Sequence, residues 1–154
     1  MGPWSLKPED PWPLEMVEEL KKCFSPGGPE ILLTLSGPLG AGKTTRIKQL
    51  AQSLGMDSNA FSSPTFLKLM EHRHFGFRVL HMDLYRVEDS AELMRWGLGE
   101  ESAALTLVEW PDLLLNAWSE NPHWHWDQHW RLQLTNDHSG VLSKVSKSFI
   151  QSKV

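Results

Sequence analysis

Three glycines, a lysine and two threonines between residues 37 and 45 have the spacing of a phosphate-binding loop. A glycine followed after four residues by Gly-Lys-Thr is the P-loop pattern, and the segment reads Gly37-Pro38-Leu39-Gly40-Ala41-Gly42-Lys43-Thr44-Thr45. Glycines permit positive φ, so successive backbone N–H groups can turn toward phosphate oxygens. The lysine adds a point charge near the β and γ phosphates, and the first threonine hydroxyl holds Mg²⁺. We therefore predict that nucleotide is bound by Gly37, Leu39, Gly40, Ala41, Gly42, Lys43, Thr44 and Thr45.

Two carboxylates follow apolar runs later in the chain and are the candidate partners of this loop. Asp83 ends the β-like run 77–82, and Glu109 ends the apolar run 105–108. Ligands of open α/β sheets sit beyond the carboxyl ends of the strands, so both acids should converge on phosphate and Mg²⁺. One would bind the metal together with Thr44, and the other would orient or deprotonate an attacking water. Spacing does not assign these roles, so Asp83 and Glu109 are both predicted as catalytic and metal-binding, with Lys43 as a further catalytic residue.

The elements that must position these residues can be read from hydrophobic patterns. Residues 31–35 form an uninterrupted apolar run suited to a strand buried on both faces. After the loop, apolar residues recur with helical spacing at Ile47, Leu50, Ala51 and Leu54. Residues 66–71 and 77–82 resemble a hairpin that turns at 74–76, while Pro111 suits the start of another helix. We predict a three-layer α/β P-loop NTPase domain with a central mixed, mainly parallel sheet.

The chain has the size of one domain, which we assign to residues 1–154. Its length is 154 residues, 40% of them hydrophobic and 22% charged. Residues 1–12 read as an irregular N-terminal segment with a short edge strand near 4–7, and the elements in 123–154 are less certain. There is no apolar stretch of about 18 residues and no basic-then-apolar leader, so a cytoplasmic protein without membrane contact is expected. Cys23 is the single cysteine, which excludes an intrachain disulfide.

The overall charge argues against tight direct binding to a nucleic-acid backbone. The formal net charge is −4 and the sequence pI is about 5.9. A large basic surface would be needed to neutralise phosphates. We therefore expect any direct contact with tRNA to be weak.

Four motifs in order resemble the TsaE family, formerly YjeE, of bacterial P-loop ATPases in tRNA threonylcarbamoyladenosine synthesis. They cover roughly residues 14–118 and comprise GPLGAGKTT from Gly37, Ser63-Pro64-Thr65-Phe66, His81-x-Asp83-Leu84-Tyr85-Arg86 and Leu107-Val108-Glu109-Trp110-Pro111. The resemblance implies ATP hydrolysis with Mg²⁺ and association with the TsaD and TsaB proteins, which transfer threonylcarbamoyl to adenosine 37 of tRNA. It also implies that Thr65 lies in a switch-like segment near the γ-phosphate and that Asp83 is needed for activity. Glu109 would assist the metal, and Trp110 would lie near the nucleotide.

The sequence departs from the family pattern in three places. Pro38 stands where the family usually has an acidic residue, which matters little if only the backbone holds phosphate. The segments 69–77 and 123–130 match no family pattern. In the second, His123, His125 and His129 alternate with tryptophans and could suggest a metal site. A surface loop whose tryptophans partly cover the sheet or meet a partner is favoured.

Other functions of a P-loop compete with ATP hydrolysis. A small P-loop kinase would need a cationic lid, for which Arg86 and Arg95 alone are a thin supply. A GTP switch lacks an Asn-Lys-x-Asp-like guanine reader in this sequence. A nucleotide-gated adaptor with negligible hydrolysis remains an alternative.

Overall fold

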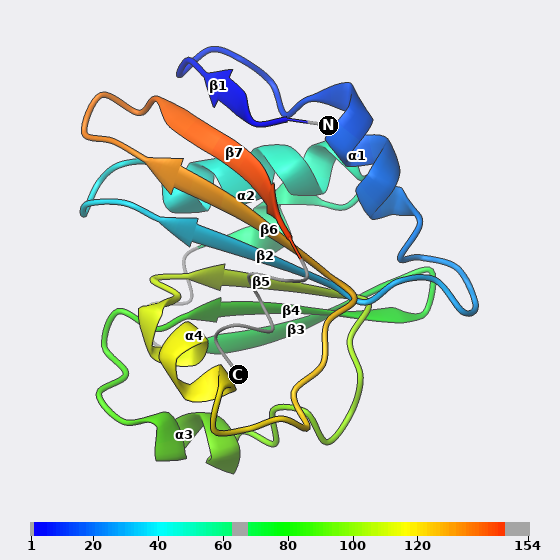
Figure 1. Cartoon of the computed structure of the whole chain (residues 1–154). Helices are drawn as coiled ribbons and strands as arrows, with labels where there is room; N and C mark the ends of the chain where they lie inside the picture. The colour runs from blue at the N-terminus through cyan, green and yellow to red at the C-terminus, as the bar shows by residue number, and fades with distance from the viewer. Residues whose placement is uncertain (1, 63–67, 147–154) are drawn as a thin grey trace.

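A seven-stranded mixed sheet forms the centre of the computed structural model, which describes residues 2–62 and 68–146 (Figure 1). The strand order is β1-β7-β6-β2-β5-β4-β3. The strands are β1 (Trp4–Leu6), β2 (Ile31–Ser36), β3 (Leu69–His74), β4 (Phe77–Asp83), β5 (Leu105–Glu109), β6 (Gln128–Leu134) and β7 (Gly140–Val145). The four central strands β6, β2, β5 and β4 are parallel, and the remaining pairings are antiparallel.

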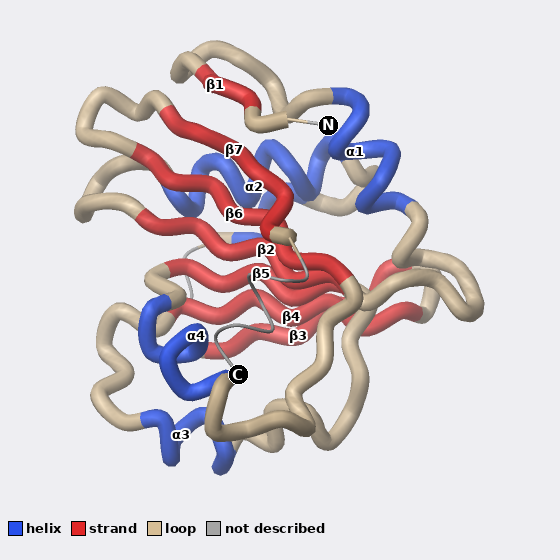
Figure 2. Tube along the Cα trace, viewed as in Figure 1, coloured by secondary structure: helices blue, strands red, loops and turns tan. Residues whose placement is uncertain are grey.

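Four α-helices and one short 3-10 helix pack on this sheet in the described ranges (Figure 2). They are α1 (Leu14–Lys21), α2 (Lys43–Ser53), η1 (Ser58–Phe61), α3 (Ser90–Arg95) and α4 (Asp112–Trp118). Helices α1 and α2 cover one face, and α3 and α4 cover the other (Figure 1). The predicted three-layer α/β fold with a mixed sheet is confirmed.

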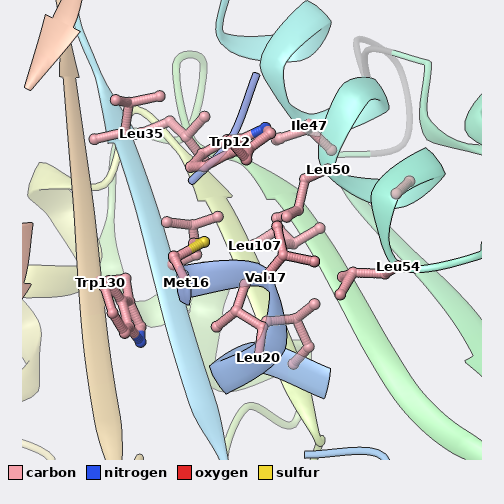
Figure 3. Close-up of a cluster of buried hydrophobic side chains, with 14 of the residues drawn as sticks. Trp12, Met16, Val17, Leu20, Leu35, Ile47, Leu50, Leu54, Leu107 and Trp130 are labelled. Atoms are coloured by element: carbon pink, nitrogen blue, oxygen red, sulfur yellow. The ribbon is translucent and has the colours of Figure 1, made fainter. Parts of the chain in front are cut away.

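Strand alternation divides the core into two clusters on the two faces of the sheet. Leu33 and Leu35 of β2 pack with α1 and α2, whereas Leu32 belongs to the cluster that contains α3 and α4. Figure 3 shows the first cluster, in which side chains of both helices lie against the central strands. Burial of both faces explains why the β2 sequence is apolar without alternation.

Several local predictions are confirmed, with small shifts at the element ends. The predicted hairpin forms, but His74 belongs to β3, and only Phe75 and Gly76 make the turn, both with positive φ. Such a two-residue turn suits the twist of the flanking strands. Helix α2 ends before Gly55, whose φ of 84° and N–H bond to Gln52 O are those of a helix C-terminal stop. Helix α4 begins after Pro111, and β1 forms the predicted edge strand.

The tryptophans of the stretch 123–130 cover the sheet, as one of the two predicted alternatives had it. Trp124 and Trp126 pack from the loop before β6 into the core on the α3/α4 face, while Trp130 lies in β6 and is fully buried on the opposite face. His129 is buried beside Thr34 Oγ1 at 2.8 Å, and burial lowers its pKa to about 4. Within residues 2–62 and 68–146, no group of three His, Cys, Asp or Glu residues could hold a metal ion, which removes support for the histidine metal site.

None of the helices in the described part of the chain is long and apolar enough to span a bilayer.

Candidate functional site

The carboxyl ends of three parallel strands meet at the start of α2 and create the candidate site (Figure 1). In the register, Glu109 of β5 pairs with Leu35 of β2 on one side and with Asp83 of β4 on the other. The loop 37–42 follows β2 directly and leads into α2. The two predicted carboxylates therefore lie side by side, next to the P-loop, as their places at the carboxyl ends of the predicted strands indicated.

The loop backbone has the conformation that its glycines permit. Gly40 and Gly42 have φ angles of 79° and 99°, in the left-handed region that disfavours other residues. At Gly37 a Cβ would lie 2.7 Å from the carbonyl oxygen of Leu134, so that position also requires a residue without a side chain. Helix α2 has no side-chain cap, which leaves its first backbone N–H groups available to an anion.

The side chain of Lys43, the first residue of α2, is buried against the P-loop and does not extend into solvent. Its Nζ donates to the carbonyl oxygens of Gly37 at 2.6 Å and Pro38 at 2.9 Å, and lies 3.9 Å from the ring centroid of Trp110. Burial lowers the pKa of Lys43, while the charges of Glu109 and then Asp83 raise it. These contacts hold the ammonium against the loop backbone and the Trp110 indole, where the charges of both acids act on it.

Thr44, Glu109 and His81 form a hydrogen-bonded chain next to the loop, in which Thr44 is half-buried and the other two residues are buried. The Thr44 hydroxyl donates to Glu109 Oε1 at 2.7 Å, and the other oxygen, Oε2, lies 2.7 Å from His81 Nε2. Glu109 is 3% exposed and His81 is fully buried. Buried Nδ1 of His81 has no partner in the described ranges, and an unpaired acceptor is tolerated more readily than an unpaired N–H. We therefore assign Nε2 as the protonated nitrogen, which donates to the Glu109 carboxylate.

Asp83 is half-buried, and its carboxylate makes fewer hydrogen bonds than that of Glu109. Its Oδ1 accepts the backbone N–H of Tyr85 at 3.0 Å. Burial raises the pKa of Asp83, and the nearby Glu109 charge adds to this increase, while the Tyr85 hydrogen bond and the charge of Lys43 oppose it. A carboxylate with a raised pKa beside a phosphate loop is suited to accept a proton.

Trp110 lies at one side of the site, in contact with Lys43. Its backbone has a φ of 56°, rare for a bulky residue, and its N–H donates to Leu35 O at 3.1 Å. The indole contacts the Tyr85 ring, with centroids 4.7 Å apart, as well as Lys43. The resemblance placed Trp110 near the nucleotide, and in the structure it borders the loop.

The remaining residues that were predicted to bind nucleotide differ in how exposed their side chains are. Ala41 is buried, while Thr45 is exposed on the first turn of α2 and Leu39 points outward with 74% of its surface exposed. For Leu39 and Thr45 only the backbone is positioned to serve a phosphate. Thr65 lies outside the described residues.

His81 is the site residue to which sequence reasoning gave no role. It lies two positions before Asp83 on β4, so both side chains project from the same face of the sheet as α2. That alternation was visible in the His81-x-Asp83 spacing. The spacing could not show the register of β4 against β5, which brings His81 close to Glu109.

The donor set fits Mg²⁺, which prefers oxygen ligands and is usually held by one or two protein groups together with substrate phosphates. Because the Thr44 hydroxyl hydrogen is directed to Glu109, the lone pairs of Oγ1 remain available to a cation. Asp83 adds a second carboxylate in the neighbouring register position. Thr44, Glu109 and Asp83 are therefore the residues that could hold this metal.

Comparison with known proteins places the chain in a family. The family model described as threonylcarbamoyl adenosine biosynthesis protein TsaE matches residues 14–141. The tRNA threonylcarbamoyladenosine biosynthesis protein TsaE of Bacillus subtilis strain 168 is 37% identical over 112 residues, covering 71% of this chain and 66% of that protein. Its namesake from Haemophilus influenzae is 36% identical over 84 residues, covering 53% of this chain and 52% of that protein.

The fold is also similar to a solved structure. The crystal structure of Bacillus subtilis YdiB has a TM-score of 0.54 and 23% identity, with 97% of this chain and 88% of that chain covered. Matches to the two curated relatives span between about half and two thirds of their lengths. The family model covers far more than half of the chain and includes every described residue of the site. The chain belongs to the TsaE family of tRNA threonylcarbamoyladenosine biosynthesis proteins.

Proposed function

We propose that this chain binds and hydrolyses ATP with Mg²⁺ and supports threonylcarbamoyl transfer to tRNA by TsaD and TsaB. The observation that carries the ATPase proposal is the Thr44–Glu109 hydrogen bond, at 2.7 Å, beside Asp83 and below the P-loop. A glycine-rich turn without nucleotide chemistry does not require two carboxylates and a threonine hydroxyl at its base.

Phosphate binding follows from the loop and from α2. The uncapped N-terminus of α2 carries partial positive charge and unpaired N–H groups, and Lys43 adds a full charge. In the structure, Lys43 donates to two loop carbonyls. A γ-phosphate offers a charged acceptor, which makes a stronger hydrogen bond than a carbonyl. We expect Lys43 to turn from these carbonyls toward the phosphates.

The metal-binding role is divided between the two carboxylates and Thr44. Bound Mg²⁺ would neutralise charge on the phosphates. Glu109 has one oxygen on Thr44 and the other on His81, so it fixes the threonine hydroxyl as well as its own orientation. Asp83, with its raised pKa, is the group that we expect to orient water and take its proton.

The tRNA-modification role rests on family membership. Both relatives are named as tRNA threonylcarbamoyladenosine biosynthesis proteins. Association with TsaD and TsaB follows from the resemblance of the four motifs to the family. The net charge of −4 supports a role through protein partners rather than through tight tRNA binding.

The phosphate site is tested by thermal unfolding with and without ATP·Mg²⁺. At one hundred times the dissociation constant, ligand adds about 2.7 kcal/mol, or roughly 5–10 °C for a domain of this size. Wild type and Lys48→Ala, a control on the same helix, should show this increase, and Lys43→Ala should lose most of it. Each protein is compared with its own nucleotide-free midpoint. An equal increase in Lys43→Ala would contradict the assignment.

A further inference from the structure

Glu109 is hydrogen-bonded from two different elements, one of which lies outside the P-loop and its helix. Thr44, in the first turn of α2, donates to Oε1 at 2.7 Å, and His81 of β4 lies 2.7 Å from Oε2. The two oxygens of a carboxylate are fixed relative to each other, so the two bonds together hold the group in one orientation. The second bond depends on the sheet, because β4 and β5 are parallel neighbours (Figure 1).

Among the described residues, Glu109 is the single hydrogen-bond partner of the His81 side chain. His81 is fully buried, and its Nδ1 has no partner in the described ranges. In the register it lies between Met70 of β3 and Leu107 of β5. A buried imidazole costs free energy unless its hydrogen bond is made, and an apolar side chain would fill the same space without that cost. Packing alone therefore does not account for a histidine at this position.

Aromatic packing restricts the His81 ring from the side of η1. Phe61, the last residue of η1, is 1% exposed, and its ring centroid lies 6.0 Å from that of His81. On β3, the His72 ring lies 4.1 Å from the same Phe61 ring, again between centroids. The orientation of His81 is thus supported by neighbours that make no hydrogen bond with it, while Nε2 is directed at Glu109.

We propose that His81 is a positioning residue for the metal site, an inference that rests on the ATPase function proposed above. Its Nε2–H holds Glu109 so that Oε1 accepts the Thr44 hydroxyl hydrogen, which leaves the lone pairs of Thr44 Oγ1 available to Mg²⁺. Loss of the His81 bond frees both groups, and the affinity for metal falls. The hydrogen bonds of Lys43 go to the loop and not to His81, so nucleotide affinity in the absence of metal is retained.

The donor at Nε2 is tested by comparing His81→Gln with His81→Asn. Both substitutions introduce a side-chain amide, but only glutamine places its nitrogen about as far from the backbone as Nε2 of histidine. Binding of Mn²⁺, which takes the same oxygen ligands as Mg²⁺, is followed by electron paramagnetic resonance in the presence of ADP. His81→Asn should bind Mn²⁺ about 10–100-fold more weakly, the usual effect of losing a group that orients a metal ligand. His81→Gln should remain close to wild type.

His129→Asn is the matched control. His129 is also a buried histidine with one hydrogen bond to a neighbouring strand, at Thr34, but it contacts Trp118 on the α3/α4 face. This variant should bind Mn²⁺ with ADP as wild type does. Thermal unfolding verifies that each variant is folded.

Two further measurements separate positioning from a role in folding. The increase in thermal midpoint with ADP and EDTA should be equal in wild type, His81→Asn and His81→Gln. In nucleotide-free wild type, long-range ¹H–¹⁵N NMR of the histidine rings should place the His81 proton on Nε2. A proton on Nδ1, equal Mn²⁺ affinity of the two variants, or loss of the response to ADP in His81→Asn overturns the inference.

ATP turnover distinguishes a failure of this inference from a failure of the proposed function. His81→Asn should need more Mg²⁺ for its half-maximal rate, yet retain the wild-type KM for ATP at saturating Mg²⁺. No turnover in wild type, with the Mn²⁺ affinities ranked as expected, would contradict ATP hydrolysis and support the role of His81. Normal turnover with an unchanged Mg²⁺ requirement in His81→Asn would contradict the role of His81 alone.

Discussion

At the scale of single residues, the two carboxylates of the site differ in how far their oxygens are already used. Both oxygens of Glu109 are engaged, by the Thr44 hydroxyl and by His81 Nε2. Asp83 accepts only the Tyr85 N–H among its described hydrogen bonds. Sequence spacing left the two acids equivalent. Their contacts support a positioning and metal role for Glu109 and a proton-accepting role for Asp83.

The raised pKa of Asp83 predicts a conflict between stability and activity. Burial disfavours the ionised form, so the folded-state pKa lies above the ordinary value of 3.8. The resulting destabilisation is fully present above the folded pKa and disappears as pH falls toward 3.8. Asp83→Asn should therefore raise the thermal midpoint of nucleotide-free protein at pH 8, by an amount that shrinks on acidification, while ATP turnover falls at least tenfold.

The exposed acid Asp112 at the start of α4 provides the control for that experiment. Asp112→Asn should not raise the midpoint at pH 8 and should retain turnover. A lower midpoint for Asp83→Asn at pH 8 would show that the ionised carboxylate is favoured in the folded protein, and undiminished turnover would exclude Asp83 from the reaction.

At the scale of elements, the site depends on a backbone turn that joins β2 to α2. Gly42 precedes α2 with a φ of 99°, and a Cβ there would lie 3.2 Å from His138 Nδ1 in the β6–β7 turn. A residue with a side chain in such a conformation costs about 1–3 kcal/mol. The same turn orients the first N–H groups of α2. We therefore expect stability and the proposed phosphate binding to be coupled at Gly42.

We predict that Gly42→Ala lowers the thermal midpoint by several degrees and also reduces the increase produced by ATP·Mg²⁺. Gly55→Ala is the matched control, since Gly55 lies at the other end of α2 with a φ of 84°, and a Cβ added there would have no neighbouring atom within 4 Å. It should lower the midpoint but retain the response to ATP·Mg²⁺. Normal nucleotide binding in Gly42→Ala would show that the loop tolerates a changed turn.

The strands themselves were easier to predict from the sequence than the order in which they pair in the sheet. Hydrophobic patterns correctly predicted the buried strand at 31–35 and the helix that carries Ile47 and Leu50, because hydrophobic periodicity is a local signal. Nothing local indicates that β6, which follows α4, pairs with β2. The role of His81 and the burial of Trp124 depend on such long-range pairing. Local spacing could therefore predict the P-loop and its acids, but not the histidine behind them.

At the scale of the whole molecule, the candidate nucleotide site is bordered by an apolar rim, which we define by the exposed side chains of Leu39 and Tyr85. Leu39 in the P-loop is 74% exposed, and Tyr85, stacked on Trp110, is 53% exposed. Exposed apolar side chains grouped at a functional site mark surfaces that proteins cover. We therefore expect a protein partner to contact the chain at this rim, next to the candidate nucleotide site.

A pull-down with TsaD and TsaB, with and without ATP·Mg²⁺, tests the partner proposal together with the rim. Wild type should be retained more strongly with nucleotide, and Leu39→Ser should reduce retention because it removes apolar contact from the rim. Phe75→Ser is the control, since Phe75 is 82% exposed but lies in the β3–β4 turn at the other end of the sheet. Thermal unfolding of Leu39→Ser with ATP·Mg²⁺ separates lost partner contact from lost nucleotide binding. No retention of wild type in either condition would contradict the association, and equal losses in Leu39→Ser and Phe75→Ser would place the contact elsewhere.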